Sequence, residues 1–371
     1  MIKGIVIGVI CVLLPINLAL GAGKKPEEKL LKKTLKPAGV AEDKSTDEGH
    51  VKEDYEKKAA TKWNFNGTFR YLYGQGRMEG KFLGRDYKEK IILPTWRTRL
   101  YVAYKADDHW TVNGALEDNR VLNNHAMDDT VHWHRGYLEG NYPKTKILAG
   151  RFGYKVSRGN VMDTTADGLR LRLGESKNNV TIFTGRIGSE ERRREGYILN
   201  AYKLWDKKII TEAAYFQFKN TANSWQTWNE QKVMDFTLGY QFTPDVFLTW
   251  EYLRAKGKDR NHTVKDKNGY VFNFNYGDYD YRKKGSYRWR LRYYRQPQAS
   301  IIVHTMNGYP EFFNTLSQRL GMRGWGFCWD YVLTKGVLLT LEGYDLKNLY
   351  RTKVADNLRE RIIGGSITFA L

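Results

Sequence analysis

Arginines at alternate positions are the residues whose type and spacing point most directly to chemistry. Arg288, Arg290 and Arg292 are separated by single residues. Guanidinium groups stay charged and donate hydrogen bonds in a fork that fits carboxylate and phosphate groups. Similar alternating segments contain further arginines, at Arg70, Arg97, Arg99, Arg170 and Arg172. The acids at equivalent positions are fewer, namely Glu117, Glu139, Asp235, Glu251 and Glu342. We therefore expect this set of side chains to attract anions electrostatically.

Sequence motifs for catalysis are missing. The chain has no Gly-x-Ser-x-Gly, and none of its seven histidines is followed two positions later by serine. Gly-rich phosphate loops and paired cysteine motifs are also absent. Asp108 and His109 could form a carboxylate–imidazole pair, but they lie in a predicted short turn. We expect no catalytic residue and no enzymatic activity.

Two histidines offer the best set of candidate metal ligands. His132 and His134 share one face of a predicted strand and could hold a metal ion with His125 or Asp128. Two histidines without a fixed third ligand are more often interface or loop residues. The sequence by itself therefore predicts neither a metal site nor a cofactor.

The elements that carry the arginines have two distinct faces. In a strand, successive side chains point to opposite sides, so Tyr287, Trp289 and Leu291 share the face opposite the three arginines. The same division recurs in Met234 to Phe242 and in Thr95 to Lys105. One face suits lipid and the other needs water. Repeated segments of about ten residues with this period predict an all-β fold, a transmembrane antiparallel β-barrel. A soluble β-sandwich rich in aromatic residues is the alternative.

The amino-terminal part divides into two segments. Residues 1–23 combine Lys3, an apolar stretch from Ile5 to Leu20 and a small-residue end, which predicts a secretory signal peptide. Retention of this segment as a membrane anchor is the alternative. Residues 24–62 are polar and charged, which predicts a periplasmic tether, and the sequence leaves open whether it binds peptidoglycan. The transmembrane barrel is expected over residues 63–371.

Sixteen candidate strands can be placed from Trp63 to Leu371. Short spacers alternate with long ones along the chain, as expected for short periplasmic turns and long external loops. To keep the number of strands even, we expect residues 299–306 to form a strand. Tyr270 to Tyr276 are then placed within a long sixth external loop. Arg192, Arg193 and Arg194 are expected in the fourth external loop.

A local segment strengthens the barrel interpretation. Gly150-Arg151-Phe152-Gly153 is followed by Gly159-Asn160-Val161-Met162-Asp163 and then by Asp167-Gly168. This segment resembles that of Gram-negative outer-membrane porins of the 16-stranded type, in which a Gly-Arg strand end leads into a third external loop. The resemblance implies that residues 153–166 fold inward and narrow a pore. Arg151, Asp163 and Asp167 would belong to this constriction, with Asp163 opposite Arg97 or Arg99.

A barrel of sixteen strands is wide enough to leave an aqueous channel in place of a packed interior. We therefore expect a passive diffusion channel for small hydrophilic solutes, with a preference for anions. Two other functions stay open: an arginine-lined exporter or specific channel for an acidic polysaccharide, and a structural or adhesive barrel whose pore is plugged.

The environment of such a protein follows from this expectation. It would lie in the bacterial outer membrane, against lipid and lipopolysaccharide, after insertion by the barrel assembly machinery. A homotrimer is one assembly that the sequence leaves open. Nucleic acid is not expected as a partner despite the net charge of +20, because the chain is exported.

Overall fold

The computed structural model describes residues 62–82, 84–122, 131–187, 194–220, 228–259, 263–302, 320–351 and 355–371. The predicted signal peptide and the tether lie outside the described residues, apart from Lys62. Within the described ranges, no helix is both long and apolar enough to cross a membrane.

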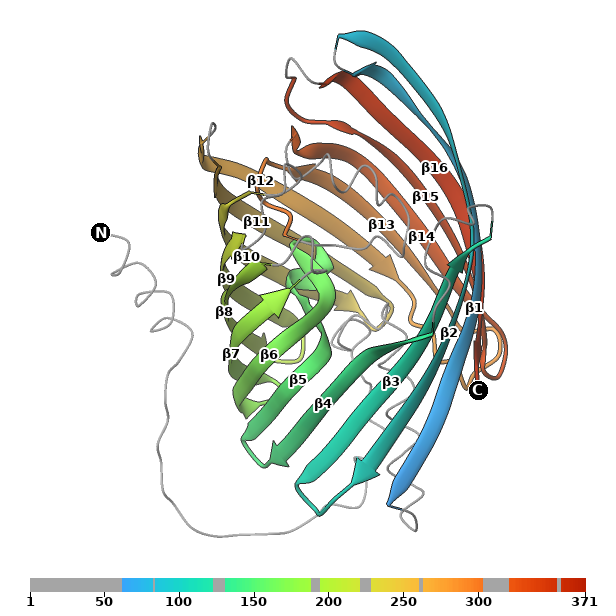
Figure 1. Ribbon diagram of the computed structural model, residues 1–371, viewed down its shortest axis with the longest axis vertical. Coiled ribbons are helices and arrows are strands. Elements are labelled where there is room, and N and C mark those ends of the chain that lie inside the picture. Colours follow the sequence, from blue (N-terminus) through green and yellow to red (C-terminus); the bar gives the residue numbers. More distant parts are fainter. Residues whose placement is uncertain are drawn as a thin grey trace.

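Sixteen strands pair in sequence order, each antiparallel to its neighbours, and β1 pairs with β16 to close the barrel (Figure 1). The fold class predicted from the sequence is therefore confirmed. The strands are β1 Trp63–Phe82, β2 Arg85–Lys105, β3 Trp110–Val121, β4 His132–Tyr142, β5 Thr145–Val156, β6 Met162–Glu175, β7 Asn178–Ile187, β8 Arg194–Trp205, β9 Ile209–Asn220, β10 Glu230–Thr243, β11 Val246–Lys258, β12 Thr263–Tyr276, β13 Tyr287–Gln296, β14 Met322–Thr334, β15 Val337–Asn348 and β16 Ala355–Ala370.

The alternation of side chains sorts the residues into an outer and an inner face. In β10, Phe236 and Leu238 are 38% and 42% exposed, whereas Asp235 and Thr237 between them are 4% and 0% exposed. Because β1 pairs with β16, the wall has no edge strand whose backbone donors and acceptors lie open along its whole length. Such a wall can sit in lipid with its apolar face outward.

Short turns connect the strands at one end of the barrel, which we call the short-turn end. These turns include residues 143–144, 176–177, 244–245 and 335–336, and β1 also begins at this end. The opposite end, where β5 leads into β6, is called the loop end. The alternation of short and long connections read from the sequence therefore corresponds to the two ends of the barrel.

The identity of the twelfth strand differs from the prediction. Residues 270–276 lie in β12, which pairs with β11 from Val246↔Tyr276 to Lys258↔Thr263 and with β13 from Tyr270 to Tyr276. Residues 299–302 form no strand, and residues 303–306 lie outside the described part of the chain. The strand prediction was wrong here because the connection 277–286 is a long one at the short-turn end. Gly277 N donates to Asp245 O there, and Gly336 N donates to Tyr281 O.

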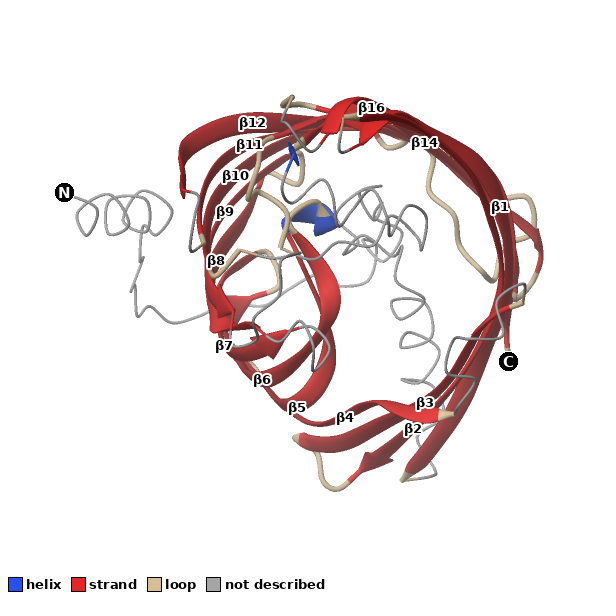
Figure 2. Ribbon diagram, turned by 45° about the horizontal axis from the view of Figure 1, so that its top comes forward, coloured by secondary structure: helices blue, strands red, loops and turns tan. Residues whose placement is uncertain are grey.

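Part of the interior is packed, whereas the function favoured from the sequence was an aqueous channel and a plugged pore was an alternative. The hairpin of β5 and β6 ends in the short 3-10 turn η2, Ser157–Gly159, and Figure 2 shows this tip inside the ring of strands. Apolar side chains of the hairpin and of residues 299–302 pack against the inner face of the wall as one buried cluster. Its members include Phe152, Tyr154, Val156, Val161, Met162, Phe183, Ile198, Phe216, Phe218, Ala299, Ile301 and Ile302.

Candidate functional site: the charged inner wall

The three alternating arginines of β13 lie on the inner face. Arg288 and Arg290 are 8% and 5% exposed, whereas Tyr287 and Trp289 beside them are 37% and 39% exposed on the outer face. Arg288 Nη2 lies 2.8 Å from Asp330 Oδ2, and Arg290 Nη2 lies 3.6 Å from the same oxygen. The Nε of Arg292 donates to Asn273 Oδ1 at 3.2 Å. Two of these arginines therefore form an ion-pair network with one carboxylate that braces the wall.

Asp330 was missing from the acids singled out in the sequence. It is 3% exposed on β14 and also accepts a hydrogen bond from Thr340 Oγ1 at 2.9 Å. The alternation of Trp325, Phe327, Trp329 and Tyr331 already placed Asp330 on the inner face of its strand. Its pairing with β13 could not be found without the register between strands.

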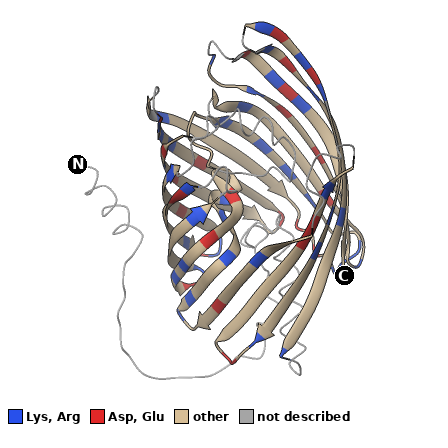
Figure 3. Cartoon of the chain, viewed as in Figure 1, with Lys and Arg blue, Asp and Glu red and all other residues tan. Residues whose placement is uncertain are grey.

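The arginines of β1 and β2 meet across one strand pair. Arg70 and Arg97 are register partners on the inner face, and both are half-buried. Like charges directly opposite each other destabilise a sheet unless opposite charge lies nearby. The next arginine, Arg99, donates from Nε to Glu117 Oε2 on β3. Figure 3 shows that basic and acidic residues occur on strands all around the barrel.

Strands β4 to β6 carry the remaining charged candidates on their inner faces. Arg170 stacks over the rings of Phe152 and Tyr154, with its guanidinium carbon 5.5 and 5.2 Å from the ring centroids. Arg172 is half-buried two residues further along β6. The buried carboxylate of Glu139 pairs with Lys146 Nζ at 2.8 Å.

The hairpin tip reaches across the interior to the wall formed by β10, β11 and β13. Asn160 Nδ2 donates to both carboxylate oxygens of Glu251, at 2.8 and 2.9 Å. Gln296 Nε2 donates to Asn160 O at 2.7 Å, and the Arg158 guanidinium lies over the Phe247 ring. The tip thus covers Glu251, which is 1% exposed, and contacts the wall beside Asp235.

The residues expected at the constriction lie on the same hairpin. Arg151 Nε bonds to Asp167 Oδ1 at 2.6 Å, and the pair is exposed on the face opposite Phe152. Asp163 Oδ2 lies 3.6 Å from Lys155 Nζ. The approach of Asp163 to Arg97 or Arg99, and the role of all three residues in narrowing a pore, stay predictions.

Arg194 is not part of an external loop. It is the first residue of β8 and is 2% exposed, with Nη1 donating to Gln231 Oε1 at 3.1 Å and Nη2 donating to Ile302 O. Gln231 Nε2 in turn donates to the carbonyls of Ala299 and Ile301, both at 2.7 Å. Arg194 therefore holds residues 299–302 inside the barrel, whereas Arg192 and Arg193 lie outside the described residues.

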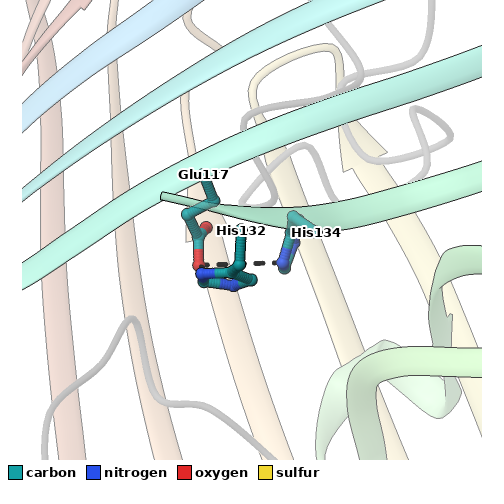
Figure 4. Close-up of side chains that lie close together, drawn as sticks. All are labelled: Glu117, His132 and His134. Atoms are coloured by element: carbon teal, nitrogen blue, oxygen red, sulfur yellow. Dashed lines mark ion pairs between the residues drawn. The ribbon is translucent and has the colours of Figure 1, made fainter. Parts of the chain in front are cut away.

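A β-bulge in β4 brings two histidines to a carboxylate on the inner wall. Ala115 pairs with Arg135 and Leu116 with Trp133, so His134 is the extra residue between them. His132 consequently lies opposite Glu117, and Trp133 turns outward. Figure 4 shows both imidazoles beside Glu117, whose Oε1 lies 3.7 Å from His134 Nδ1 and 3.9 Å from His132 Nε2. His125 and Asp128, the third ligands considered from the sequence, lie outside the described residues.

Comparisons with known proteins identify the class of the fold. No protein-family model matches the chain, and no curated protein is similar to it in sequence. Among solved structures, an anion-selective porin from Comamonas acidovorans has a TM-score of 0.55 at 11% identity, covering 83% of this chain and 100% of that one. OmpT of Vibrio cholerae with its loop L8 deleted has a TM-score of 0.54 at 12% identity, covering 83% and 100%. OmpF of Salmonella typhi in complex with daunomycin has a TM-score of 0.51 at 11% identity, covering 83% and 97%. The structural neighbours are thus outer-membrane porins, and the chain shares their closed barrel fold.

Proposed function

We propose that this protein is a passive diffusion channel of the bacterial outer membrane for small hydrophilic solutes, with a preference for anions and no catalytic activity. The porin fold supports the general function. The observation that carries the anion preference is the register pairing of Arg70 with Arg97 on the inner face. Lipopolysaccharide contacts, insertion by the barrel assembly machinery and a homotrimer remain parts of this proposal.

The distribution of charge supports anions over cations. Several inner-face acids are either paired or covered: Glu117 with Arg99, Asp330 with Arg288, and Glu251 beneath the hairpin tip. Arg70, Arg97 and Arg172 are half-buried, so they retain contact with water. Because a nearby charge acts most strongly on an ion at close range, these arginines lower the electrostatic cost of an anion in the channel.

Reversal potentials in a planar bilayer under a salt gradient test the preference. The wild-type protein should give the sign of anion selectivity, and R70Q/R97Q should shift the potential toward cations, because glutamine removes charge at similar length. The matched control is R323Q/R361Q, which removes two exposed arginines on the outer face. If the control shifts the potential as far as the inner pair does, the arginines of the wall do not set selectivity.

A plugged barrel is a second candidate because residues 299–302 and the β5–β6 hairpin pack as a buried apolar cluster in the interior. Single-channel conductance distinguishes the two functions. Stepwise, ion-carrying openings support the diffusion channel, whereas purified protein that inserts but stays silent supports the plug. Block of the current by an oligo-uronate would instead indicate a channel specific for acidic polysaccharide.

A further inference from the structure

We propose that Glu117, His132 and His134 form a binding site for a transition-metal ion, such as Zn²⁺, on the inner wall of the barrel. The sequence offered two histidines without a fixed third ligand, and the register between β3 and β4 brings Glu117 beside them. One donor atom from each of the three residues lies within 4.8 Å of the others. The site depends on the bulge, because a regular register would place Trp133 opposite Glu117 and turn both histidines outward.

The two separations from the Glu117 oxygen to the imidazole nitrogens fit a metal ion better than they fit hydrogen bonds. Tetrahedral coordination with bonds of about 2.1 Å separates two ligand atoms by about 3.4 Å. The separations of 3.7 and 3.9 Å from Glu117 Oε1 to the two imidazole nitrogens therefore need to shrink by only a few tenths of an ångström. They are too long for direct N–H···O hydrogen bonds. The His132 side chain is 52% exposed, so an ion can arrive from the lumen and water can complete its coordination.

The surrounding charges select the kind of ion. Arg99 holds the second carboxylate oxygen, Oε2, which fixes the orientation of Glu117 and leaves Oε1 toward the histidines. A single carboxylate beside an arginine is a poor site for Ca²⁺ or Mg²⁺, which need several oxygen ligands. Two imidazoles and a carboxylate suit Zn²⁺, Co²⁺, Ni²⁺ or Cu²⁺, which bond well to nitrogen. The site is thus specific for late transition metals.

Titration calorimetry of the full-length protein in detergent, with ZnCl₂ as the probe, tests this site. H132Q should weaken Zn²⁺ binding about tenfold or more, since outer-shell changes alone cost 10–100-fold. H109Q is the matched control: His109 lies in a short turn, stacked on Tyr142, with Nδ1 3.0 Å from Asn141 O. That variant should bind as the wild type does. H134Q removes the other histidine ligand and should weaken Zn²⁺ binding as well. Circular dichroism checks that each variant keeps its strands.

Cobalt gives an independent readout. Co²⁺ should produce visible absorption bands of a low-coordinate nitrogen and oxygen site in the wild type and in H109Q, and these bands should be weak in H132Q. Excess Ca²⁺ should leave them unchanged. Equal Zn²⁺ affinity in the wild type, H132Q and H134Q, or displacement of Co²⁺ by Ca²⁺, would overturn the proposal. Neither measurement depends on whether the barrel conducts ions.

Discussion

At the scale of single residues, Asn160 makes polar contacts between the inserted hairpin and the wall. Its amide donates to both oxygens of a carboxylate that is almost completely shielded from water. The turn that presents it is unusual, since Ser157 and Arg158 both have φ of 53°. Non-glycine residues rarely adopt this left-handed conformation, so contacts with the wall must hold the turn in place.

Asn160→Ala should therefore lower the free energy of unfolding. Removal of the Asn160 amide leaves buried Glu251 without these two hydrogen bonds, and an unsatisfied buried group of this kind costs about 1–3 kcal/mol. Urea denaturation followed by tryptophan fluorescence measures the change. Asn179→Ala is the control, because Asn179 caps an exposed turn with longer bonds of 3.1 and 3.3 Å to backbone carbonyls. An equal decrease in the free energy of unfolding in the two variants would show that the contact with Glu251 stabilises the protein no more than an exposed turn contact does.

At the scale of elements, β12 is the strand that sequence analysis misplaced. Its outer face carries Phe272 and Phe274, which are 49% and 39% exposed, and its inner face carries Asn273, which binds Arg292. The two-faced division is the same as in strands that were predicted correctly. The difference lies in the ten-residue connection 277–286, which is long for the short-turn end and in which Arg282 Nε donates to Asp280 Oδ1 at 2.9 Å.

Substitution of Phe274 tests whether β12 crosses the membrane. Phe274→Arg should destabilise the barrel in lipid vesicles by up to about 2–4 kcal/mol, the cost of a lipid-facing arginine at the midplane, which falls toward either interface. Phe274→Leu is the control at the same site, and it should change the stability by less than about 1.5 kcal/mol because it stays apolar. Folding equilibria in urea with vesicles supply both values. If the arginine variant is as stable as the leucine variant, this segment does not face lipid.

At the scale of the whole molecule, the net charge of +20 does not by itself decide selectivity. Charges on the outside of the barrel are separated from an ion in the lumen by the wall and by screening salt. The Debye length is about 10 Å at 0.1 M salt and about 3 Å at 1 M. The arginines on the inner face can lie closer than one Debye length to an ion in the lumen, so the salt screens their effect on that ion least.

The proposed anion preference should therefore weaken with salt without disappearing. Reversal potentials at a fixed concentration ratio should be largest when both solutions are dilute and should fall as both are raised toward molar salt. The R70Q/R97Q variant should show a smaller change over the same range, because less inner charge is left to screen. A wild-type potential that is independent of salt would mean that pore size, and not charge, sets selectivity.

The sequence by itself determined which residues share a face, because the two-residue period of a strand is a local property of the backbone. It follows that the β-barrel class, the outward aromatic residues and the inward side of Arg288 and Arg290 could be predicted. The tertiary structure decided which residues of neighbouring strands lie opposite each other. The choice of β12, the pairing of Asp330 with two arginines and the convergence of His132 and His134 on Glu117 all depend on register between strands. The insertion of the hairpin depends on contacts such as that of Asn160 with Glu251, 91 residues apart in the chain. A local period carries no information about such distant pairs, since they form only when the whole barrel closes.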